Sequence, residues 1–457
     1  MSEQPESGNA RRVPLPGLAS LAACADRMDA AWSLMRELYR ICRSITGDGV
    51  RKTLARVAAE VPLEIVEVPS GTPVFDWEVP REWNVREAWI ADESGQRVVD
   101  MRDHTLHLMS YSAPVDAVVP LEELRPHLHS IPEHPDWIPY RTSYYREDWG
   151  FCLTHRSLES LRPGRYRVRI DSDFKSGSLT YGECIVPGTS SDEVLVFTHV
   201  CHPSLCNDNL TGIALAALLA KELRGSEPRY TYRFVFAPGT IGSITWLARN
   251  EEGVRRVRHG LVVGLVGDPG PLTFKRSRRG DAEIDQVARY VLGRISPSAR
   301  VIDFSPYGYD ERQLCSPGFD LPVGRLTRTP NNEYPEYHTS ADDFTLIERS
   351  ALAESLFACA EIVRVLERNA RYLNLSPKCE PRLGKRGLFR STGGRHPGEF
   401  EHALLWVLNQ SDGSKSLLDI AERSGLPFEL IAEAADALVD VELLRPLGAA
   451  VEGGRQA

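Results

Sequence analysis

The amino-acid sequence predicts an α/β fold whose sheet is mixed but mostly parallel. The main observation is that apolar, strand-like runs alternate with helical segments between residues 182 and 370, the order that builds a parallel sheet covered by helices. A second observation is a β-rich stretch, residues 66–181, that interrupts this pattern. A third is a group of three helical stretches near the C-terminus. A chain of 457 residues is long enough for these parts to be separate domains.

The first part of the α/β domain is predicted to be helical. Residues 1–26 are polar and rich in Pro and Gly, without the apolar segment of a signal peptide, and they predict a disordered leader. Residues 27–65 are expected to form helices, because apolar positions such as Leu34, Leu38 and Ile41 recur at helical spacing.

Residues 66–181 form the predicted insertion. Short alternating runs broken by Pro, Gly and Asp, for example residues 165–170, are typical of half-buried strands. Residues 140–150 hold a high density of aromatic and charged side chains, among them Tyr145 and Arg146. Such side chains suit the mouth of a binding pocket, and we expect these two to contact a substrate. The same stretch also fits a half-buried strand followed by the start of a helix.

Strands and helices alternate regularly in the second part of the α/β domain, residues 182–370. The predicted elements are strand 194–197, helix 210–223, strand 231–237, helix 241–249, strand 261–266 and helix 281–293. The run at 194–197 is apolar and suits a strand buried on both faces. Polar residues that follow such a strand lie at the sheet edge where open α/β proteins bind ligands.

The C-terminal part is predicted to be a basic, Gly-rich linker, residues 371–398, and a winged-helix domain, residues 399–450. A DNA-reading winged helix needs a basic recognition helix. Residues 429–440, in that position, include four acidic side chains and neither Lys nor Arg. We therefore expect a packing, dimerisation or partner module, through which homo-oligomers can form.

Composition argues against several classes of protein. The formal net charge is −9, which disfavours nucleic acid as a partner. Apolar runs stay well short of the about 18 residues of a membrane span. The nine cysteines are odd in number and lack CxxC pairing, which favours a reducing cytoplasm over a disulfide framework. Phosphate-loop and nucleophile-elbow motifs are absent from the sequence. A cytoplasmic protein with a small-molecule substrate is the expectation.

The strongest functional signal is the sequence THVCHPSLCNDNLTG, residues 198–212. It places His199, His202 and Asp208 between the buried strand and the next helix. Imidazole nitrogens and a carboxylate oxygen suit zinc. Asp208 is flanked by two asparagines in a predicted tight turn, which can aim its carboxylate back at the histidines. In the alternative interpretation, the histidines only end the strand and the asparagines only start the helix.

Five motifs together resemble the co-catalytic zinc aminopeptidase superfamily, which includes bacterial leucyl aminopeptidases and glutaminyl cyclases. They are THVCHPSLCNDNLTG, APGTIGSITWL (237–247), VGDPG (266–270), YDERQLCSPG (309–318) and EYHTSADD (336–343). The chain is more similar still to a bacterial aminopeptidase-like subfamily, over about residues 27–447. The resemblance implies a zinc-aminopeptidase-like three-layer core, an inserted small β-rich domain and a C-terminal winged helix.

The resemblance also implies the metal ligands. They are Asp208, His199 or His202 or both, Asp268 from the VGDPG motif and His338 from the EYHTSADD motif. From the residues alone, Asp268 also fits a turn before Pro and Gly, and His338 also fits a loop that caps the next element.

One departure from the superfamily lies at the start of the predicted helix 241–249. Members of the superfamily have two adjacent glutamates there, one the general base and the other a metal ligand. Gly239 and Thr240 occupy these positions, and neither binds zinc tightly or takes up a proton. One zinc ion per chain is therefore expected rather than two.

A substitute base is expected in the YDERQ sequence, because the matching superfamily loop borders the substrate pocket. Asp310 and Glu311 are the candidates, although an acidic first turn of a helix explains them equally well. Arg312 is expected to pair either with a substrate carboxylate or with Glu311. Tyr337, beside His338, is a further expected substrate contact.

These observations predict a cytoplasmic zinc-dependent hydrolase of the aminopeptidase-like type. Its substrate would be an aminoacyl or N-acyl amide in a small biosynthetic intermediate. Zinc would polarise the amide carbonyl and activate water, and Glu311 or Asp310 would relay the proton. The competing hypothesis is a metal-binding scaffold without catalysis in a biosynthetic complex. Gly239 and Thr240 favour the scaffold, and the retained set of metal-binding residue types argues against it.

Overall fold

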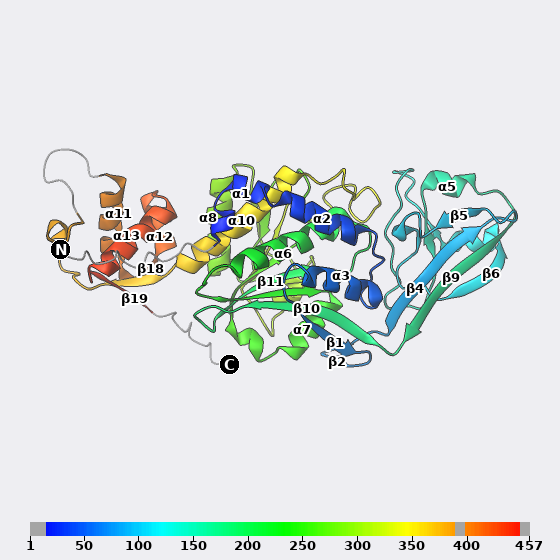
Figure 1. The fold of residues 1–457 in the computed structure, drawn as a ribbon, viewed down its shortest axis with the longest axis horizontal. Helices are drawn as coiled ribbons and strands as arrows, with labels where there is room; N and C mark the ends of the chain where they lie inside the picture. Colours follow the sequence, from blue (N-terminus) through cyan, green and yellow to red (C-terminus); the bar gives the residue numbers. More distant parts are fainter. Residues whose placement is uncertain (1–14, 389–397, 448–457) are drawn as a thin grey trace, which may run out of the picture. The chain divides into compact units, whose positions relative to one another are not determined.

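The computed structural model describes residues 15–388 and 398–447 (Figure 1). The chain divides into two compact units, Met1–Ala360 and Glu361–Ala457. The first unit contains an eight-stranded sheet, the helices that cover it and a smaller four-stranded sheet. The second unit contains a three-stranded sheet with its own helices.

The large sheet is mixed, as the sequence predicts. Its strands are β1 (Glu64–Pro69), β10 (Ser178–Val186), β11 (Glu193–His199), β12 (Thr231–Ala237), β13 (Val257–Val263), β14 (Thr273–Lys275), β15 (Arg300–Ile302) and β16 (Val323–Thr327). Their order is β1-β10-β12-β11-β13-β16-β14-β15. The central strands β12, β11, β13 and β16 run parallel, whereas the pairings β1/β10, β10/β12 and β14/β16 are antiparallel. The parallel carboxyl ends therefore lie at one edge of the sheet.

Helices cover both faces of this sheet. They are α2 (Met28–Tyr39), α3 (Asp48–Ala58), α6 (Thr211–Leu223), α7 (Ile241–Arg249), α8 (Glu283–Ile295), α9 (Glu311–Leu314) and the first part of α10 (Arg349–Arg368). Figure 1 shows α2 and α6 on one side of the sheet and α7 on the other. All seven residues of β11 are buried as a result, which explains its apolar sequence. Within the described residues, no helix has both the length and the apolar character of a membrane span.

Residues 15–26 are folded, in contrast to the disordered leader predicted for residues 1–26. A short turn, η1 (Pro16–Leu18), leads into α1 (Leu21–Ala25). Leu15, Leu18 and Cys24 are fully buried, so their apolar side chains outweigh the Pro- and Gly-rich composition on which the prediction rested. Residues 1–14 lie outside the described part of the chain.

The insertion forms an antiparallel sheet of its own. Its strands are β4 (Glu82–Ala91), β5 (Arg97–Asp100), β6 (Val115–Pro120) and β9 (Arg165–Lys175), in the order β5-β4-β9-β6. Shorter elements complete it: β2 (Pro73–Val74), β3 (Trp77–Glu78), η2 (Thr105–His107), α4 (Leu121–Leu124), η3 (Arg125–His127), β7 (Leu128–His129), β8 (Phe151–Cys152) and α5 (His155–Ser160). The predicted limits, residues 66 and 181, fall inside β1 and β10 of the large sheet. The separate sheet is therefore narrower than expected.

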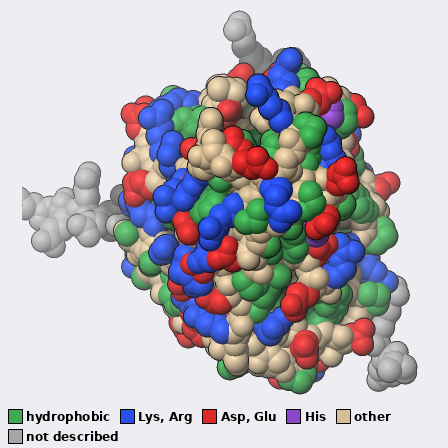
Figure 2. All heavy atoms as spheres, turned by 90° about the vertical axis from the view of Figure 1, so that its right-hand side faces the viewer, with side chains coloured by type: hydrophobic (Ala, Val, Ile, Leu, Met, Phe, Trp, Pro, Cys, Tyr) green, Lys and Arg blue, Asp and Glu red, His purple; other side chains and the backbone are tan. Residues whose placement is uncertain are grey.

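The exposed face of the insertion carries charges of both signs. Figure 2 shows basic and acidic side chains intermixed on this end of the molecule. Several of them pair across strands, for example Arg86 with Asp173 at 2.6 Å and Arg169 with Asp116 at 2.6 Å. Charges of both signs thus alternate on this face.

The second unit is a winged helix that begins earlier than predicted. Its elements are β17 (Arg371–Asn374), η6 (Leu383–Arg386), α11 (Glu399–Gln410), β18 (Asp412–Ser416), α12 (Leu417–Ser424), α13 (Phe428–Asp440) and β19 (Leu444–Pro446). β17 lies between β18 and β19 and pairs antiparallel with both. The predicted linker, residues 371–398, thus starts with a strand that is too short to show a periodic pattern. Residues 389–397 and 448–450 lie outside the described part.

Candidate metal centre

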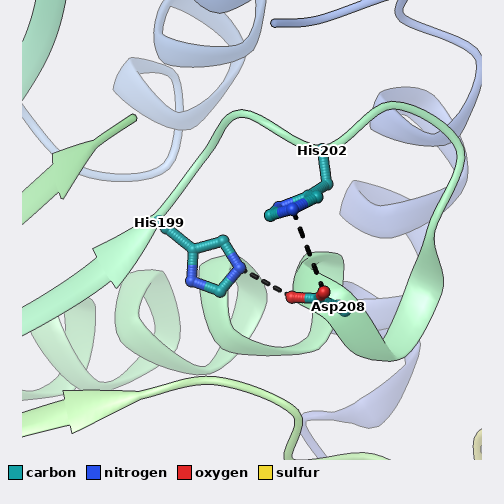
Figure 3. A group of neighbouring side chains, drawn as sticks. All are labelled: His199, His202 and Asp208. Atoms are coloured by element: carbon teal, nitrogen blue, oxygen red, sulfur yellow. Dashed lines mark hydrogen bonds and ion pairs between the residues drawn. The ribbon is translucent and has the colours of Figure 1, made fainter. Parts of the chain in front are cut away.

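His199, His202 and Asp208 form a buried cluster at the carboxyl edge of the sheet (Figure 3). His199 ends β11, His202 lies in the following loop, and Asp208 lies in the turn η4 (Cys206–Leu210) before α6. One ligand atom from each residue lies within 4.8 Å of those of the other two. Asp208 Oδ1 is 2.7 Å from His199 Nε2, and Asp208 Oδ2 is 4.0 Å from His202 Nε2. The carboxylate thus lies between the two imidazoles.

His338 reaches the same carboxylate from a distant part of the chain. Its Nε2 lies 3.0 Å from Asp208 Oδ2. The His338 side chain is 33% exposed, whereas those of His199, His202 and Asp208 are nearly fully buried. The cluster therefore opens to solvent on the His338 side, where a substrate can approach it.

The donor atoms of the cluster fit a zinc ion. Asp208 Oδ2 and His338 Nε2 lie 3.0 Å apart, and both are buried without a hydrogen bond to any other described residue. Buried polar atoms with so few partners are costly, and a cation at this position would satisfy both atoms. Three imidazoles and one carboxylate are also the donor types that zinc prefers.

Burial sets the protonation states that metal binding needs. It lowers the pKa of His202 to about 3. It also lowers the pKa of His199, although the hydrogen bond to Asp208 acts in the opposite direction. Burial disfavours ionisation of Asp208, but His202 and His199 outweigh it and hold the pKa of this carboxyl well below its usual range. Neutral imidazoles and an ionised carboxylate are the ligating forms.

Asp342 holds the turn that carries Asp208. Its carboxylate accepts hydrogen bonds from the backbone N–H groups of Asn207 at 2.5 Å and Asp208 at 2.9 Å. Its backbone carbonyl accepts a third from Cys206 at 2.9 Å. Asp342 is fully buried. Asp342 belongs to the EYHTSADD motif, of which only Tyr337 and His338 were predicted to belong to the site. The two aspartates that end the motif were the sequence feature that could have indicated its role.

Aromatic rings surround the histidines. The Tyr309 ring lies 4.1 Å from that of His199, measured between centroids, and Tyr337 stacks on His338 at 3.9 Å. The Tyr140 ring lies 5.2 Å from His202 and 5.1 Å from His338. Because Tyr140 belongs to residues 66–181, the insertion supplies part of the site wall. Tyr140 begins the aromatic stretch 140–150 and Tyr309 begins the YDERQLCSPG motif, but neither ring was predicted to contact the histidines.

Tyr309 also occupies the space beside Gly239. A Cβ atom added to Gly239 would lie 2.1 Å from Cε1 of the Tyr309 ring. The ring therefore fills the space that a longer side chain at position 239 would need. Because an aromatic ring lies where a carboxylate would have to lie, position 239 cannot supply a second metal ligand.

Asp268 lies outside the cluster, contrary to its predicted role as a metal ligand. Its carboxylate accepts hydrogen bonds from Asn207 Nδ2 at 3.0 Å, Gly270 N–H at 2.9 Å and both Oγ1 and N–H of Thr329, at 2.5 and 3.2 Å. β13 ends at Val263, three residues before the predicted strand end, so Asp268 follows a loop. Its contacts brace Asn207, the neighbour of the cluster carboxylate.

Asp310 and Glu311 are adjacent but have different surroundings. Both are fully buried. Glu311 Oε1 is 2.9 Å from Lys275 Nζ, and the Glu311 carboxylate also accepts a hydrogen bond from the Tyr309 N–H. Asp310 has no ion-pair partner among the described residues, and burial raises its pKa to about 7, although a hydrogen bond with the Ser243 side chain acts in the opposite direction. Glu311 is therefore held ionised by an ion pair, whereas the Asp310 carboxyl changes its protonation state near neutral pH.

The buried ion pair of Glu311 should matter for stability. Lys275→Ala leaves a buried carboxylate without its closest cation, so we expect the free energy of unfolding to fall by about 3–5 kcal/mol. Urea unfolding measures this change. Lys221→Ala is the matched control, because Lys221 is 54% exposed and pairs with Glu60 at 3.1 Å, and exposed pairs contribute about 0–1 kcal/mol. Equal losses in the two variants would contradict a structural role for the Lys275–Glu311 pair.

The predicted substrate contacts lie at different depths. Tyr337 is beside the cluster, as described above. Arg312 is partly buried and its Nε has no hydrogen-bond partner among the described residues. Tyr145 is 63% exposed and its ring packs against that of Trp77 at 5.2 Å. Arg146 is 80% exposed and pairs with its neighbour Asp148. Only Tyr337 touches a residue of the cluster.

Comparisons with known proteins agree with this architecture. Residues 32–369 match a family model described as the domain of unknown function DUF4910, and residues 370–446 match a model of a winged helix-turn-helix. A Clostridium acetobutylicum protein, described as a polysaccharide biosynthesis protein with an aminopeptidase-like domain, is 51% identical over 91% of this chain and 95% of its own length.

Solved structures confirm the predicted fold. A structure described as a peptidase from Clostridium acetobutylicum has a TM-score of 0.88 at 48% identity, over 93% of this chain and 98% of that one. A zinc aminopeptidase from Bacillus subtilis has a TM-score of 0.55 at 12% identity, over 77% of this chain and 95% of that one. The first unit thus has the fold of the zinc aminopeptidases.

Proposed function

Because the chain belongs to the DUF4910 family, with an aminopeptidase-like domain joined to a winged helix, we propose that it is a zinc-dependent amide hydrolase. Its substrate is an aminoacyl or N-acyl amide in a small biosynthetic intermediate. The observation that carries the proposal is the buried cluster of His199, His202 and Asp208, which opens to solvent beside His338. The relative described as a polysaccharide biosynthesis protein supports a biosynthetic substrate.

One zinc ion would be held by Asp208, His338 and one or both of His199 and His202. When bound, it supplies Lewis-acid chemistry, which polarises an amide carbonyl and makes water more acidic. Asp310 acts as the general base, because its carboxylate is buried, has no ion-pair partner among the described residues and has a pKa raised to about 7 by burial. It takes a proton from the attacking water and passes it to the leaving amine. The rings of Tyr140, Tyr309 and Tyr337 limit the access of bulk water.

The proposed activity is tested with a panel of aminoacyl and N-acyl amides of amino acids and amino sugars. We expect the zinc-loaded protein to hydrolyse at least one class, and chelation to abolish the reaction. Mass spectrometry of the products identifies the bond that is cleaved. Hydrolysis that survives complete removal of the metal would contradict the proposal.

The second candidate function is a metal-binding scaffold that has lost catalysis. The observation in its favour is the Tyr309 ring in the space of the superfamily glutamate at Gly239. A scaffold needs its metal for folding only. The zinc-loaded protein should then cleave no amide, and removal of zinc should lower its melting temperature. The buried Asp310, which has no ion-pair partner among the described residues, favours the hydrolase, because a scaffold gains nothing from a buried carboxyl that no cation balances.

We further propose that the protein works in the cytoplasm as a homo-oligomer. All nine cysteines are free thiols, most of them buried, as is usual in a reducing compartment. In the winged helix, α13 carries Glu429, Glu433, Asp436 and Asp440, so a protein surface suits it better than DNA. Sedimentation analysis of the whole chain tests the oligomer, and a strictly monomeric protein would contradict it.

A further inference from the structure

Arg325 is a buried arginine whose hydrogen-bonding capacity is only partly used. It lies in β16 and is 4% exposed. Its Nη2 donates to Asn331 Oδ1 at 2.6 Å, and its Nη1 is 4.0 Å from Glu311 Oε1. Its Nε is buried and makes no hydrogen bond to any described residue. A guanidinium carries five N–H donors in a planar fork, and a buried donor without an acceptor is costly. An acceptor from outside the chain would remove that cost.

Positive charge is in excess around Arg325. Lys275 is its direct cross-strand partner on β14, and Arg312 follows Glu311 in α9. Arg312 and Arg325 both act on the charge of Asp310, so the five groups form one cluster. Arg312 makes no ion pair with a described residue, and its Nε is also buried and unpaired. Even when Asp310 is ionised, the cluster holds three cations and only two carboxylates. A bound anion would make its net charge zero.

Arg325 and the metal cluster share one face of the sheet. Phe197 of β11 is in register with Val262 of β13, which is in register with Arg325 of β16. Side chains in register on neighbouring strands point to the same face, and so does His199, two residues after Phe197. Two strand spacings of about 4.8 Å separate β11 from β16, a distance that a small substrate can span.

The positive charge of Arg325 acts on side chains at the metal cluster. Burial is the main cause of the lowered pKa of His199 and the raised pKa of Tyr337, and the charge of Arg325 adds to the first shift and opposes the second. Tyr337 stacks on His338, the solvent-facing member of the cluster. Together with the shared face of the sheet, this places the guanidinium on the same side as His199.

We propose that Arg325 is the anchor for a carboxylate on the substrate, with Arg312 as a second donor on the more exposed side. The anchor rests on the proposed function, and it narrows the substrate class to amides that carry a free carboxylate, such as N-acyl or aminoacyl derivatives of amino acids. Arg325 would hold the carboxylate while the amide carbonyl faces the His199–Asp208 cluster. Arginine suits this task because its fork binds carboxylates with two parallel hydrogen bonds.

Binding of matched probe pairs tests the anchor independently of catalysis. The probes are N-acetyl amino acids and the corresponding carboxamides, measured by calorimetry on the zinc-loaded protein. We expect at least one acid to bind at least about tenfold more tightly than its carboxamide, because a charge-assisted pair is lost in the carboxamide. Arg325→Gln should abolish this difference, and Arg325→Lys should restore part of it. Acids that bind no better than their carboxamides would overturn the proposal.

Arg328→Gln is the matched control. Arg328 is also buried, but its guanidinium is occupied by Gly270 O at 2.7 Å, Ala351 O at 3.1 Å and Glu354 at 2.8 Å. This variant should keep the preference for the acid. A preference that survives Arg325→Gln would place the carboxylate elsewhere, for example on the metal, and would also overturn the proposal.

Hydrolysis of the same probes separates the two proposals. If the acid is bound through Arg325 and cleaved, both stand. If the acid is bound with the Arg325 dependence but no amide in the wider panel is cleaved, the anchor stands and the proposed activity fails. If acid and carboxamide are cleaved with the same KM and kcat, the activity stands and the anchor fails.

Discussion

Replacing Asp208 with asparagine should release the zinc and lower amide hydrolysis by more than about 100-fold, since the loss of groups that merely support metal ligands already costs about 10–100-fold. Asp208 contacts His199 at 2.7 Å and His338 at 3.0 Å, and its Oδ2 lies 4.0 Å from His202 Nε2. Asparagine keeps the shape but removes the negative charge that faces the cation. Metal analysis and turnover of the best amide substrate measure the two effects.

Asp268→Asn is the control for this prediction. Asp268 comes from the same edge of the sheet, but four hydrogen bonds tie its carboxylate to Asn207, Gly270 and Thr329. We expect the variant to keep its zinc and to lose mainly stability. Loss of zinc in Asp268→Asn and not in Asp208→Asn would contradict the assignment of the ligands.

The second large effect is expected for Asp310→Asn, which should lower kcat by about 10²–10⁴-fold, the usual contribution of a general base. A base must be ionised to accept a proton, and the pKa of Asp310 is raised to about 7 by burial. Activity of the unmodified protein should therefore increase as the pH rises through about 7. The residual activity of the variant should lack this increase. A variant with unchanged kcat would exclude Asp310 as the base.

Asp310 should also make the free energy of unfolding depend on pH, and this free energy should fall where the activity rises. The folded-state pKa of about 7 lies above the ordinary value of 3.8. Between these values the folded protein holds a proton that the unfolded chain has lost, so this group's contribution to the free energy of unfolding decreases as pH rises. The decrease amounts to roughly 4 kcal/mol over the window, at about 1.4 kcal/mol per pH unit. Asp310→Asn removes it, and the variant should be more stable than the unmodified protein near pH 8. Urea unfolding at pH 5 and pH 8 tests this sign.

Glu311→Gln distinguishes the two neighbouring carboxylates. Lys275 and Arg325 outweigh burial and lower the pKa of Glu311, so its stabilising contribution is present above the ordinary pKa and is lost in acid. The variant should lose stability at neutral pH, whereas Asp310→Asn gains it. The two adjacent residues cannot be told apart from the sequence, because Lys275 and Arg325 come from β14 and β16.

The local part of the site was predictable and the long-range part was not. His199, His202 and Asp208 lie within ten residues, between a buried strand and a helix, so the local sequence was sufficient to bring them together. His338 was found only through the resemblance. Asp268 was misplaced because β13 ends three residues before the predicted end at residue 266, and a continuous apolar run does not mark where a buried strand stops.

Contacts between distant segments account for the other differences. Tyr309 fills the space at Gly239 only because the loop before α9 folds against the start of α7. Asp342 hydrogen-bonds the backbone of the Asp208 turn from a position 134 residues away. No spacing pattern reports such contacts. The β-rich insertion was recognised from its alternation, but the role of Tyr140 in the wall of the site depends on how the insertion packs against His338.

Zinc titration of the metal-free protein tests the central claim most directly. The chelated protein should show no amide hydrolysis, and activity should return in proportion to added zinc and stop rising at one equivalent per chain. Asp208→Asn should not respond. A protein that binds zinc but cleaves no amide in the panel would contradict the hydrolase and leave the scaffold as the better account, and one that binds no zinc would contradict both.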